Sequence, residues 1–407
     1  MKKYAHRKEY FGYLMINSEG RIDLYDKSVK KYLDCGNFER IETCKLATFD
    51  YDPDLFHLKS PVLIFIELTR KCNLRCSHCY IEGGQPRTDE LSTREIITLL
   101  EELRELEVFG IIFTGGEPLL HTNIIEILRA ADQMGFDFAV FTNGTMISPK
   151  LLEQIPKRTV FNVSLDGIKT NPVLRDGVSF RFMQGKLKIL QKWRFTFACM
   201  ITITRINLNE LKDLIIWCAD NNILFGTNDC MPIGRAAENA ELLPTLADVQ
   251  SAADLFLFEE SKRKTFKAFS PQKPDEFGMN SLFDILYRLE YSTEMCKGAR
   301  GLAYVTSDGL VYPCSNCASL NLFCGGNIKK DTFSNIWRQS FQKIRSTQWK
   351  DFRVCNDCEL TTGGYYCKFR CPALSMKLHG ELTNCGATPF LKESMKARTD
   401  LYQAGLM

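Results

Sequence analysis

At 407 residues, the chain is too long for one small hydrophobic core, and we expect two or three domains. Hydrophobic residues make up 45% of the chain and charged residues 25%, as in an ordinary soluble globular protein. The formal net charge is +3 and the basic residues are spread out, which gives no support for nucleic-acid binding.

Residues 1–60 form a first segment. Their start, MKKYAHRKEYFGYL, is basic, but no apolar signal-peptide core follows it, so we expect a cytoplasmic protein. The run YFGYLMINSEGRIDLYD predicts two strands around a polar turn, and KSVKKYL predicts a short helix. This hairpin resembles part of a peptide-recognition element that captures a leader peptide by strand addition. A hairpin that only caps the next domain is an equally good alternative.

Residues 61–236 alternate short apolar strands with amphipathic helices. The first strand contains Glu67 and is too short to span a membrane. Strands are predicted at 62–68, 109–114, 136–142, 159–167, 194–204 and 223–229. Helices are predicted at 93–106, 123–135, 179–193 and 208–221. Such alternation indicates an α/β protein with a parallel sheet, either a partial (β/α)6 TIM-like barrel or an open sheet.

Beyond residue 236 the alternation stops. We expect a helical linker over 237–295, including a surface loop at AFSPQKPDEFGMNS. A cysteine-rich domain over 296–390 and a tail over 391–407 follow. Because the cysteine-rich region has few long periodic elements, we expect it to bury little apolar core and to be held by metal.

The chain has 17 cysteines and no secretion signal, so metal ligation or catalysis is a better interpretation than disulfides. Five cysteines are scattered singly and are expected to be small buried hydrophobic residues: Cys35, Cys44, Cys199, Cys218 and Cys230.

Cys72, Cys76 and Cys79 follow the first strand of the alternating region and crowd into one loop. A zinc site would need a fourth ligand, for which His78 is the nearest candidate, but the spacing is too tight for one tetrahedron. Three thiolates in one loop instead suit three corners of a cubane iron–sulfur cluster, whose fourth iron stays open.

Further motifs follow the next strands, at the sheet edge where the active sites of parallel α/β proteins lie. In TGGEPLL, Gly115 and Gly116 let the backbone approach a ligand, and Glu117 can pair with an ammonium group. Taken singly, GGEP, TNG with Asn143, and SLDG are simple turns. Together, at successive strand ends, they predict a cofactor pocket beside the cluster.

With these motifs the chain resembles the radical S-adenosylmethionine (SAM) enzymes over about residues 60–236. The matched stretches are CNLRCSHC (72–79), GGEP (115–118), SLDG (164–167) and PIGRA (232–236). The resemblance implies that Cys72, Cys76 and Cys79 hold a 4Fe–4S cluster whose open iron chelates SAM. The reduced cluster would cleave SAM to a 5′-deoxyadenosyl radical, which abstracts hydrogen from the substrate.

The same resemblance implies roles for other residues. Gly115, Gly116 and Glu117 would bind the methionyl ammonium, and Ser164 and Asp166 the ribose side. Tyr80 and His78 would flank the adenine or the cluster.

The cysteine-rich region is similar to the SPASM extension of radical SAM enzymes, which carries auxiliary 4Fe–4S clusters. The resemblance implies a first cluster on Cys296, Cys314 and Cys371, and a second on Cys355, Cys358, Cys367 and Cys385. Cys317 or Cys324 would supply the fourth ligand of the first cluster, or that site stays open to substrate. Two features count against a simple match: eight residues separate Cys358 from Cys367 where the family more usually has five, and CNDC alone equally suits a zinc knuckle.

SPASM-bearing radical SAM enzymes are often peptide maturases, so the resemblance favours a peptide or protein substrate that receives a crosslink, a thioether or an epimerised α-carbon. One alternative is oxidation or decarboxylation of a small molecule such as a tetrapyrrole intermediate. A non-catalytic electron-transfer protein is disfavoured, because a pure relay has no use for an open iron beside GGEP. We expect a reductant such as flavodoxin or ferredoxin as partner, and neither nucleic acid nor a membrane.

Overall fold

The structure is a computed structural model. It describes residues 6–9, 12–16, 22–37, 40–41, 57–248, 286, 296–358, 370–389 and 391–392. The predicted loop at 268–281, most of the predicted linker and tail, Cys44 and Cys367 lie outside these residues. Within the described residues, no helix is long and apolar enough to cross a membrane.

Nine strands form one large sheet in the order β12-β11-β10-β4-β5-β6-β7-β8-β9. Six of them are parallel and lie in chain order: β4 (Leu63–Glu67), β5 (Gly110–Thr114), β6 (Asp137–Thr142), β7 (Val160–Ser164), β8 (Phe197–Ile203) and β9 (Leu224–Asp229). A doubly wound sheet would instead reverse its strand order. The predicted partial (β/α)6 barrel is confirmed.

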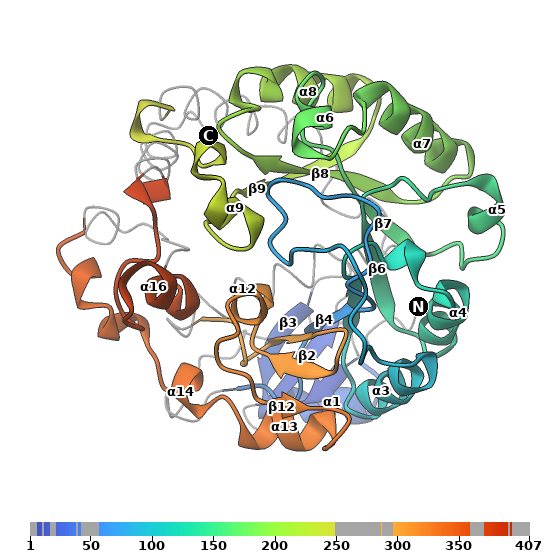
Figure 1. The fold of residues 1–407 in the computed structure, drawn as a ribbon. Helices are drawn as coiled ribbons and strands as arrows, with labels where there is room; N and C mark the ends of the chain where they lie inside the picture. The colour runs from blue at the N-terminus through green and yellow to red at the C-terminus, as the bar shows by residue number, and fades with distance from the viewer. Residues whose placement is uncertain are drawn as a thin grey trace.

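Helices cover the outside of this arc of strands (Figure 1). The long ones are α3 (Thr93–Glu105), α4 (Ile124–Gln133), α7 (Phe180–Lys192) and α8 (Leu211–Asp220). Their apolar residues recur at helical spacing and are buried, for example Ile96, Leu99, Leu100 and Leu103 on α3. Shorter helices are α5 (Pro149–Leu152), α6 (Asn171–Leu174) and α9 (Arg235–Glu238). Because the helices lie outside, the loops after the strands are free to build a site.

The N-terminal segment forms a separate antiparallel sheet of β1 (His6–Lys8), β2 (Gly12–Ile16) and β3 (Ile22–Asp26), followed by α1 (Lys30–Asp34). The predicted hairpin corresponds to β2 and β3, whereas β1 was not predicted. A small core of its own includes Tyr13, Met15, Tyr25, Val29 and Ile41.

Arg7 on β1 fastens this sheet to the barrel. Its side chain is fully buried, and its guanidinium donates to Ser60 Oγ (2.6 Å), Pro61 O (3.1 Å) and Glu107 O (3.1 Å). These three residues come just before β4 and β5. The N-terminal sheet therefore lies at the end of the barrel opposite the loops that follow the strands.

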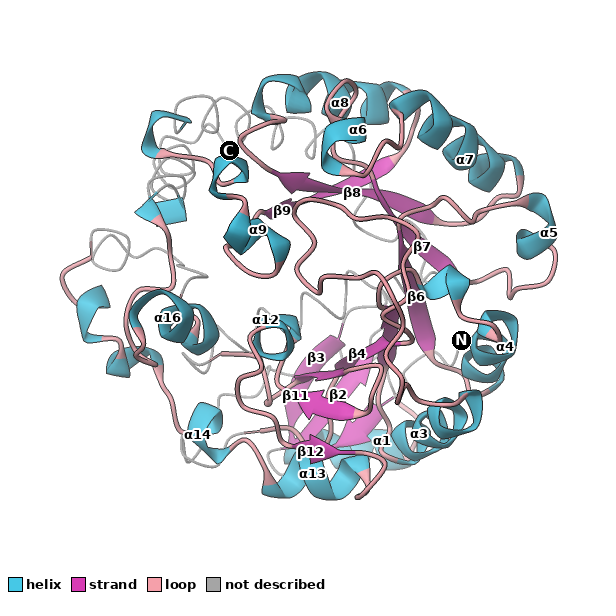
Figure 2. Cartoon of the chain, in the orientation of Figure 1, coloured by secondary structure: helices cyan, strands magenta, loops and turns pink. Residues whose placement is uncertain are grey.

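The cysteine-rich region continues the barrel's own sheet (Figure 2). Its strand β10 (Leu302–Val305) pairs in parallel with β4, and β11 (Leu310–Tyr312) and β12 (Gly326–Asn327) follow antiparallel. The helices here are α12 (Ser315–Ser319), α13 (Phe333–Gln339), α14 (Gln342–Arg345) and α16 (Pro372–His379).

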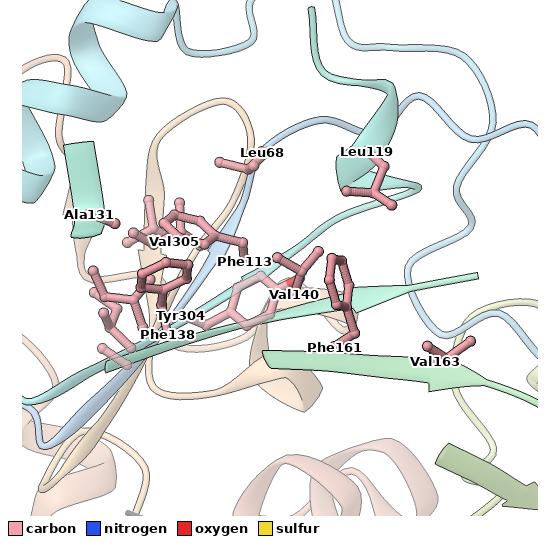
Figure 3. Packing of buried hydrophobic residues seen from close by; sticks show 14 of the residues in the cluster. Leu68, Phe113, Leu119, Ala131, Phe138, Val140, Phe161, Val163, Tyr304 and Val305 are labelled. Atoms are coloured by element: carbon pink, nitrogen blue, oxygen red, sulfur yellow. The ribbon is translucent and has the colours of Figure 1, made fainter. Parts of the chain in front are cut away.

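The expectation that this region buries little apolar core is wrong. Tyr304 and Val305 pack beside the barrel's Phe113 and Phe138 (Figure 3), and Trp337 belongs to the same buried cluster. The reason is the shared sheet, because β10 places its side chains directly in the barrel's core. Among the scattered cysteines, Cys199, Cys218 and Cys230 are buried as expected. Cys35 is exposed after the end of α1, contrary to expectation.

Candidate active site

The loop after β4 brings Cys72, Cys76 and Cys79 together. Cys72 N donates to Gly84 O (2.8 Å) and Gly84 N donates to Arg70 O (2.9 Å), which folds the loop back on itself. Burial raises the pKa of the Cys76 thiol to about 11, against the opposing charge of Arg175, and the nearby thiols of Cys79 and Cys72 add to the rise. The three predicted ligands therefore lie within electrostatic reach of one another.

The PIGRA motif binds the backbone of this cysteine loop. Arg235 Nε donates to Cys76 O (2.8 Å), its Nη1 donates to Gly83 O (3.1 Å), and its backbone N–H donates to Cys79 O (3.1 Å). Gly234 has a φ of +57°, and a Cβ there would lie closer than 3.0 Å to the carbonyl oxygens of Cys79 and Tyr80. Only glycine satisfies both conditions without moving the cysteine loop.

The two glycines of GGEP pack against the start of the cysteine loop. Gly116 N donates to Thr69 O (2.7 Å) and Glu117 N donates to Lys71 O (2.8 Å). A Cβ at Gly116 would lie closer than 3.0 Å to the carbonyl oxygens of Lys71 and its neighbour Arg70. The close approach predicted for these glycines is thus, in the first place, an approach to the chain's own backbone.

The carboxylate of Glu117 is fully buried between strand ends. Oε1 accepts from Leu119 N (3.0 Å) and Thr142 Oγ1 (2.7 Å), and Oε2 accepts from Asn143 N (2.7 Å). Burial raises its pKa to about 7, against these hydrogen bonds. Since Gly115 and Gly116 stay partly exposed, their backbone is the part of this motif that a ligand can contact.

Asp166 of SLDG is also fully buried and acts on the cysteine loop. Its Oδ2 lies 2.6 Å from Arg175 Nε and 3.1 Å from His78 Nε2, and Oδ1 accepts from Thr202 N (2.7 Å). Burial alone would raise the pKa of Asp166, but Arg175 and His78 outweigh it and the pKa is lowered. Arg175 Nη1 in turn lies 4.0 Å from Cys76 Sγ. Asp166 thus positions a cation beside a predicted ligand.

The remaining predicted cofactor residues surround the same loop. Burial raises the pKa of Tyr80 to about 12, and its phenol hydrogen-bonds with Thr114 and Tyr304. Asn143 Nδ2 donates to Asn73 Oδ1 (3.0 Å) and lies 3.9 Å from Cys72 Sγ. Ser164, at the end of β7, is partly exposed.

The loop's chemistry fits an iron–sulfur cluster with a polar organic ligand. It offers three soft thiols. Between them, Ser77 Oγ and His78 Nδ1 are buried without a hydrogen-bond partner, which leaves polar atoms for a bound group to satisfy. In the described ranges, no three His, Cys, Asp or Glu side chains are placed to share a single metal ion.

A cavity of about 380 Å³ lies between the cysteine loop and the C-terminal domain, and its size is that of a small-ligand pocket. Its lining includes Arg70, Tyr80, Arg87, Tyr312, Ser319 and Asn321. Arg70 Nε is 2.8 Å from Glu67, and Arg87 is paired with Asp308.

Four cysteines of the C-terminal domain gather in a first group. Cys314 and Cys317 have their Sγ atoms 3.6 Å apart, and the Cys317 thiol also interacts with those of Cys371 and Cys296. The hydrogen bond with Cys317 lowers the pKa of Cys314 to about 7 against its burial, helped by backbone N–H groups of Asn316 and Cys317.

A second group contains Cys355, Cys358 and Cys385, and the Cys355 thiol lies within electrostatic reach of the other two. Burial raises the pKa of Cys355, against a hydrogen bond from Arg370. Cys367, the predicted fourth member, is outside the described residues.

Sequence reasoning missed Arg175 and Tyr304. Arg175 meets Cys76 across 99 residues of chain, and Tyr304 OH meets Glu67 (3.1 Å) across 237. Neither belongs to a short motif, so no local signal marks them. Arg235 lies inside the PIGRA motif, but the sequence does not show that its side chain binds the backbone carbonyl of Cys76.

Comparison with known proteins agrees with this arrangement. Residues 66–217 match the Radical SAM superfamily, and residues 296–359 match SPASM, an iron–sulfur cluster-binding domain. The chain is 30% identical over 326 residues to the AdoMet-dependent heme synthase of Oleidesulfovibrio alaskensis, covering 73% of this chain and 80% of that one. It is 27% identical over 343 residues to the mycofactocin maturase MftC of Mycobacterium ulcerans, covering 82% and 88%.

A solved structure has a similar fold. SuiB of Streptococcus suis bound to its precursor peptide SuiA superposes with a TM-score of 0.71 at 15% identity, covering 95% of this chain and 98% of that one. The resemblance deduced from the motifs is therefore confirmed at the level of sequence and of fold.

Proposed function

Because the chain belongs to the radical SAM superfamily and carries a SPASM iron–sulfur domain, we propose that its substrate is a peptide or protein. The protein is an enzyme that uses 4Fe–4S clusters and SAM. When bound, these cofactors supply the one-electron chemistry that removes a hydrogen atom from a substrate. The proposal is that this hydrogen comes from a peptide that then gains a crosslink, a thioether or an inverted α-carbon.

The observation that carries the proposal is the N-terminal sheet. Its strand β3 pairs on one side only among the described strands, and such an edge can accept an extended peptide as a further strand. The buried Arg7 holds the sheet firmly to the barrel, so a peptide captured there stays near the enzyme. MftC, a maturase by name, matches 82% of the chain, which also supports a peptide substrate.

Within this function, we assign roles to the residues of the site. Cys72, Cys76 and Cys79 bind the cluster that works with SAM, and the backbone of Gly115 and Gly116 contacts SAM. Asp166 fixes Arg175 beside Cys76 and orients His78. Tyr80 links this centre to the C-terminal domain through its hydrogen bond to Tyr304 of β10. The setting is the cytoplasm, with a flavodoxin or ferredoxin as reductant.

A second candidate is oxidation or decarboxylation of a tetrapyrrole-like molecule. The supporting observation is the 30% identity to a heme synthase, the highest among the relatives described above. The cavity between the cysteine loop and the C-terminal domain, lined by Arg70 and Arg87, would then receive the carboxylates of the small molecule.

The test compares the two candidate substrates, a peptide and a tetrapyrrole, in the same assay. Anaerobically reconstituted enzyme receives dithionite, SAM and either the peptide encoded by a short neighbouring reading frame or a tetrapyrrole carboxylic acid. Formation of 5′-deoxyadenosine together with a mass change in the peptide supports the proposal. A mass change in the tetrapyrrole alone supports the second candidate and overturns the first. The Cys76→Ala variant should lose more than ~100-fold of 5′-deoxyadenosine formation.

A further inference from the structure

We propose that Cys317 supplies the fourth thiolate of the first auxiliary cluster, so that each iron of that cluster has a cysteine ligand. The other three ligands are Cys296, Cys314 and Cys371. This inference rests on the auxiliary clusters assigned above to the SPASM domain, and it does not depend on which substrate the enzyme takes.

The position of Cys317 argues for it. Cys317 is on α12, one turn after Cys314, with the two Sγ atoms 3.6 Å apart. It is only 1% exposed, and its thiol interacts with those of Cys371 and Cys296 as well. The four thiols thus converge from the segment before β10, the loop after the β10–β11 hairpin, α12 and the start of α16. A cubane cluster needs four thiolates converging on one space.

The surrounding polar groups are arranged around these sulfurs. Backbone N–H groups of Asn316 and Cys317 hydrogen-bond to the Cys314 thiol, and the Asn316 side chain does the same for Cys371. Gly298 N donates to Cys296 Sγ (3.4 Å), and the fully buried Arg300 holds Cys296 O (2.9 Å). Hydrogen bonds of this kind stabilise thiolates that ligate iron–sulfur clusters.

The competing candidate, Cys324, has a different environment. It is exposed, and its Sγ lies 3.7 Å from the carbonyl oxygen of Gly326, the first residue of β12. Its thiol also interacts with the phenol of Tyr312. Cys324 therefore belongs to the surface turn that leads into β12, whereas Cys317 lies inside the group of ligands.

A fully ligated cluster cannot bind the substrate through iron. Residues 318 and 319, next to Cys317, line the 380 Å³ cavity whose other wall includes Tyr80. A substrate in that cavity would lie between Tyr80 and the residues that follow Cys317. When bound, a cluster held by these four cysteines would therefore offer no open iron to a substrate in this cavity.

The test uses the full chain with Cys72, Cys76 and Cys79 changed to Ala, so that only the auxiliary clusters are loaded. Cys317→Ser and Cys324→Ser are made in this background as a matched pair. The reduced proteins are measured for iron content and for their electron paramagnetic resonance spectra with and without cyanide, which binds an open iron.

We expect the unsubstituted tail and Cys324→Ser to have equal iron and spectra that cyanide leaves unchanged. Cys317→Ser should lose about four irons per chain, or retain them with a spectrum that now shifts with cyanide. A cyanide-induced shift in the unsubstituted tail would overturn the proposal, as would a Cys317→Ser protein with unchanged iron and spectra. If Cys317→Ser does not fold, Cys324→Ser decides: unchanged iron and no cyanide shift support Cys317 as the fourth ligand, and lost iron or a new cyanide shift overturns the proposal.

Neither measurement uses SAM or substrate. A negative result here leaves the proposed peptide modification standing, and a failure to modify peptides leaves this ligand assignment standing.

Discussion

Arg175 is a buried cation beside the cysteine loop, with its Nη1 4.0 Å from Cys76 Sγ. Changing Arg175→Met leaves the buried Asp166 carboxylate with only His78 and the Thr202 N–H as partners. Removing one partner of a buried ion pair costs about 3–5 kcal/mol. We therefore expect a lower Tm and less iron on the cysteine loop, measured by thermal unfolding and iron analysis. Arg181→Met, at an exposed position of α7, is the control.

If Arg175→Met unfolds at the same temperature as the Arg181→Met control, the ion pair between Arg175 and Asp166 does not stabilise the fold. The double variant with Asp166→Asn should recover part of the loss, because neither charge is then buried alone.

Gly234 permits a second test at the level of one residue. A methyl group at Gly234 would press on the carbonyls of Cys79 and Tyr80, whereas Gly135 has a similarly positive φ of +82° and nothing within 4 Å. Gly135→Ala carries only the backbone cost of about 1–2 kcal/mol. We expect Gly234→Ala to lose, in addition, iron and 5′-deoxyadenosine formation. Equal effects of the two variants would show that the contact with the cysteine loop is unimportant.

Among the elements, β10 joins the C-terminal domain to the barrel by pairing in parallel with β4. Val305 is fully buried and pairs in register with Ile66 of β4. In the variant Val305→Asp an unpaired charge enters the shared core, which is strongly destabilising. We expect this variant to lose iron from the cysteine loop of the barrel as well as from the C-terminal domain. Val173→Asp, at a position that is 63% exposed, should behave like the wild type.

A Val305→Asp protein that loses only the auxiliary iron and still cleaves SAM would show that the barrel folds without β10.

The segment before β4 makes the stability depend on pH. His57 Nδ1 lies 2.9 Å from Leu58 O, and its ring lies edge-on to Trp337 of α13. Burial, and then the charge of Arg345, lower its pKa to about 4. The neutral ring is favoured in the fold, so its contribution is present above pH 6.5 and is lost as the pH falls from 6.5 towards 4.

We expect the wild type to lose more of its Tm between pH 7 and pH 5 than His57→Phe, which keeps the ring and cannot titrate. If the two proteins lose the same Tm between pH 7 and pH 5, His57 does not cause the pH dependence of stability.

The elements of the barrel could be predicted because each is specified locally. Strand β5 and helix α3, for example, begin and end within one residue of the predicted bounds. The pairing of β10 with β4 could not be predicted, since nothing in LAYV says which edge it joins. The predicted ligands Cys72, Cys76 and Cys79 share a loop, whereas Arg175 reaches Cys76 only through the tertiary fold. Likewise, the burial of the Glu117 carboxylate depends on Thr142, from the next strand.

At the scale of the molecule, the N-terminal sheet and the cysteine loop lie at opposite ends of the barrel strands. A strand of five residues spans about 17 Å. A peptide held on β3 therefore needs roughly ten extended residues to reach the site, once the loops are included. We expect that shortening the spacer between the captured segment and the modified residue by about half lowers kcat/KM at least ~10-fold.

A Gly/Ser spacer of the original length is the control and should retain activity. Equal rates with short and long spacers would mean that the captured segment and the modified residue bind independently.

The pairing of β10 with β4 also means that, during synthesis, one edge of β4 stays unpaired until β10 has been made. More than two hundred residues separate Glu67 from Leu302, so β4 leaves the ribosome long before the strand that covers it. At about 5–20 residues per second, that edge waits roughly 10–50 s for its neighbour. During this interval the nascent barrel exposes an apolar strand edge of the kind that other chains can join. We therefore expect the yield of folded enzyme to depend on translation speed and on the chaperones that bind the growing chain.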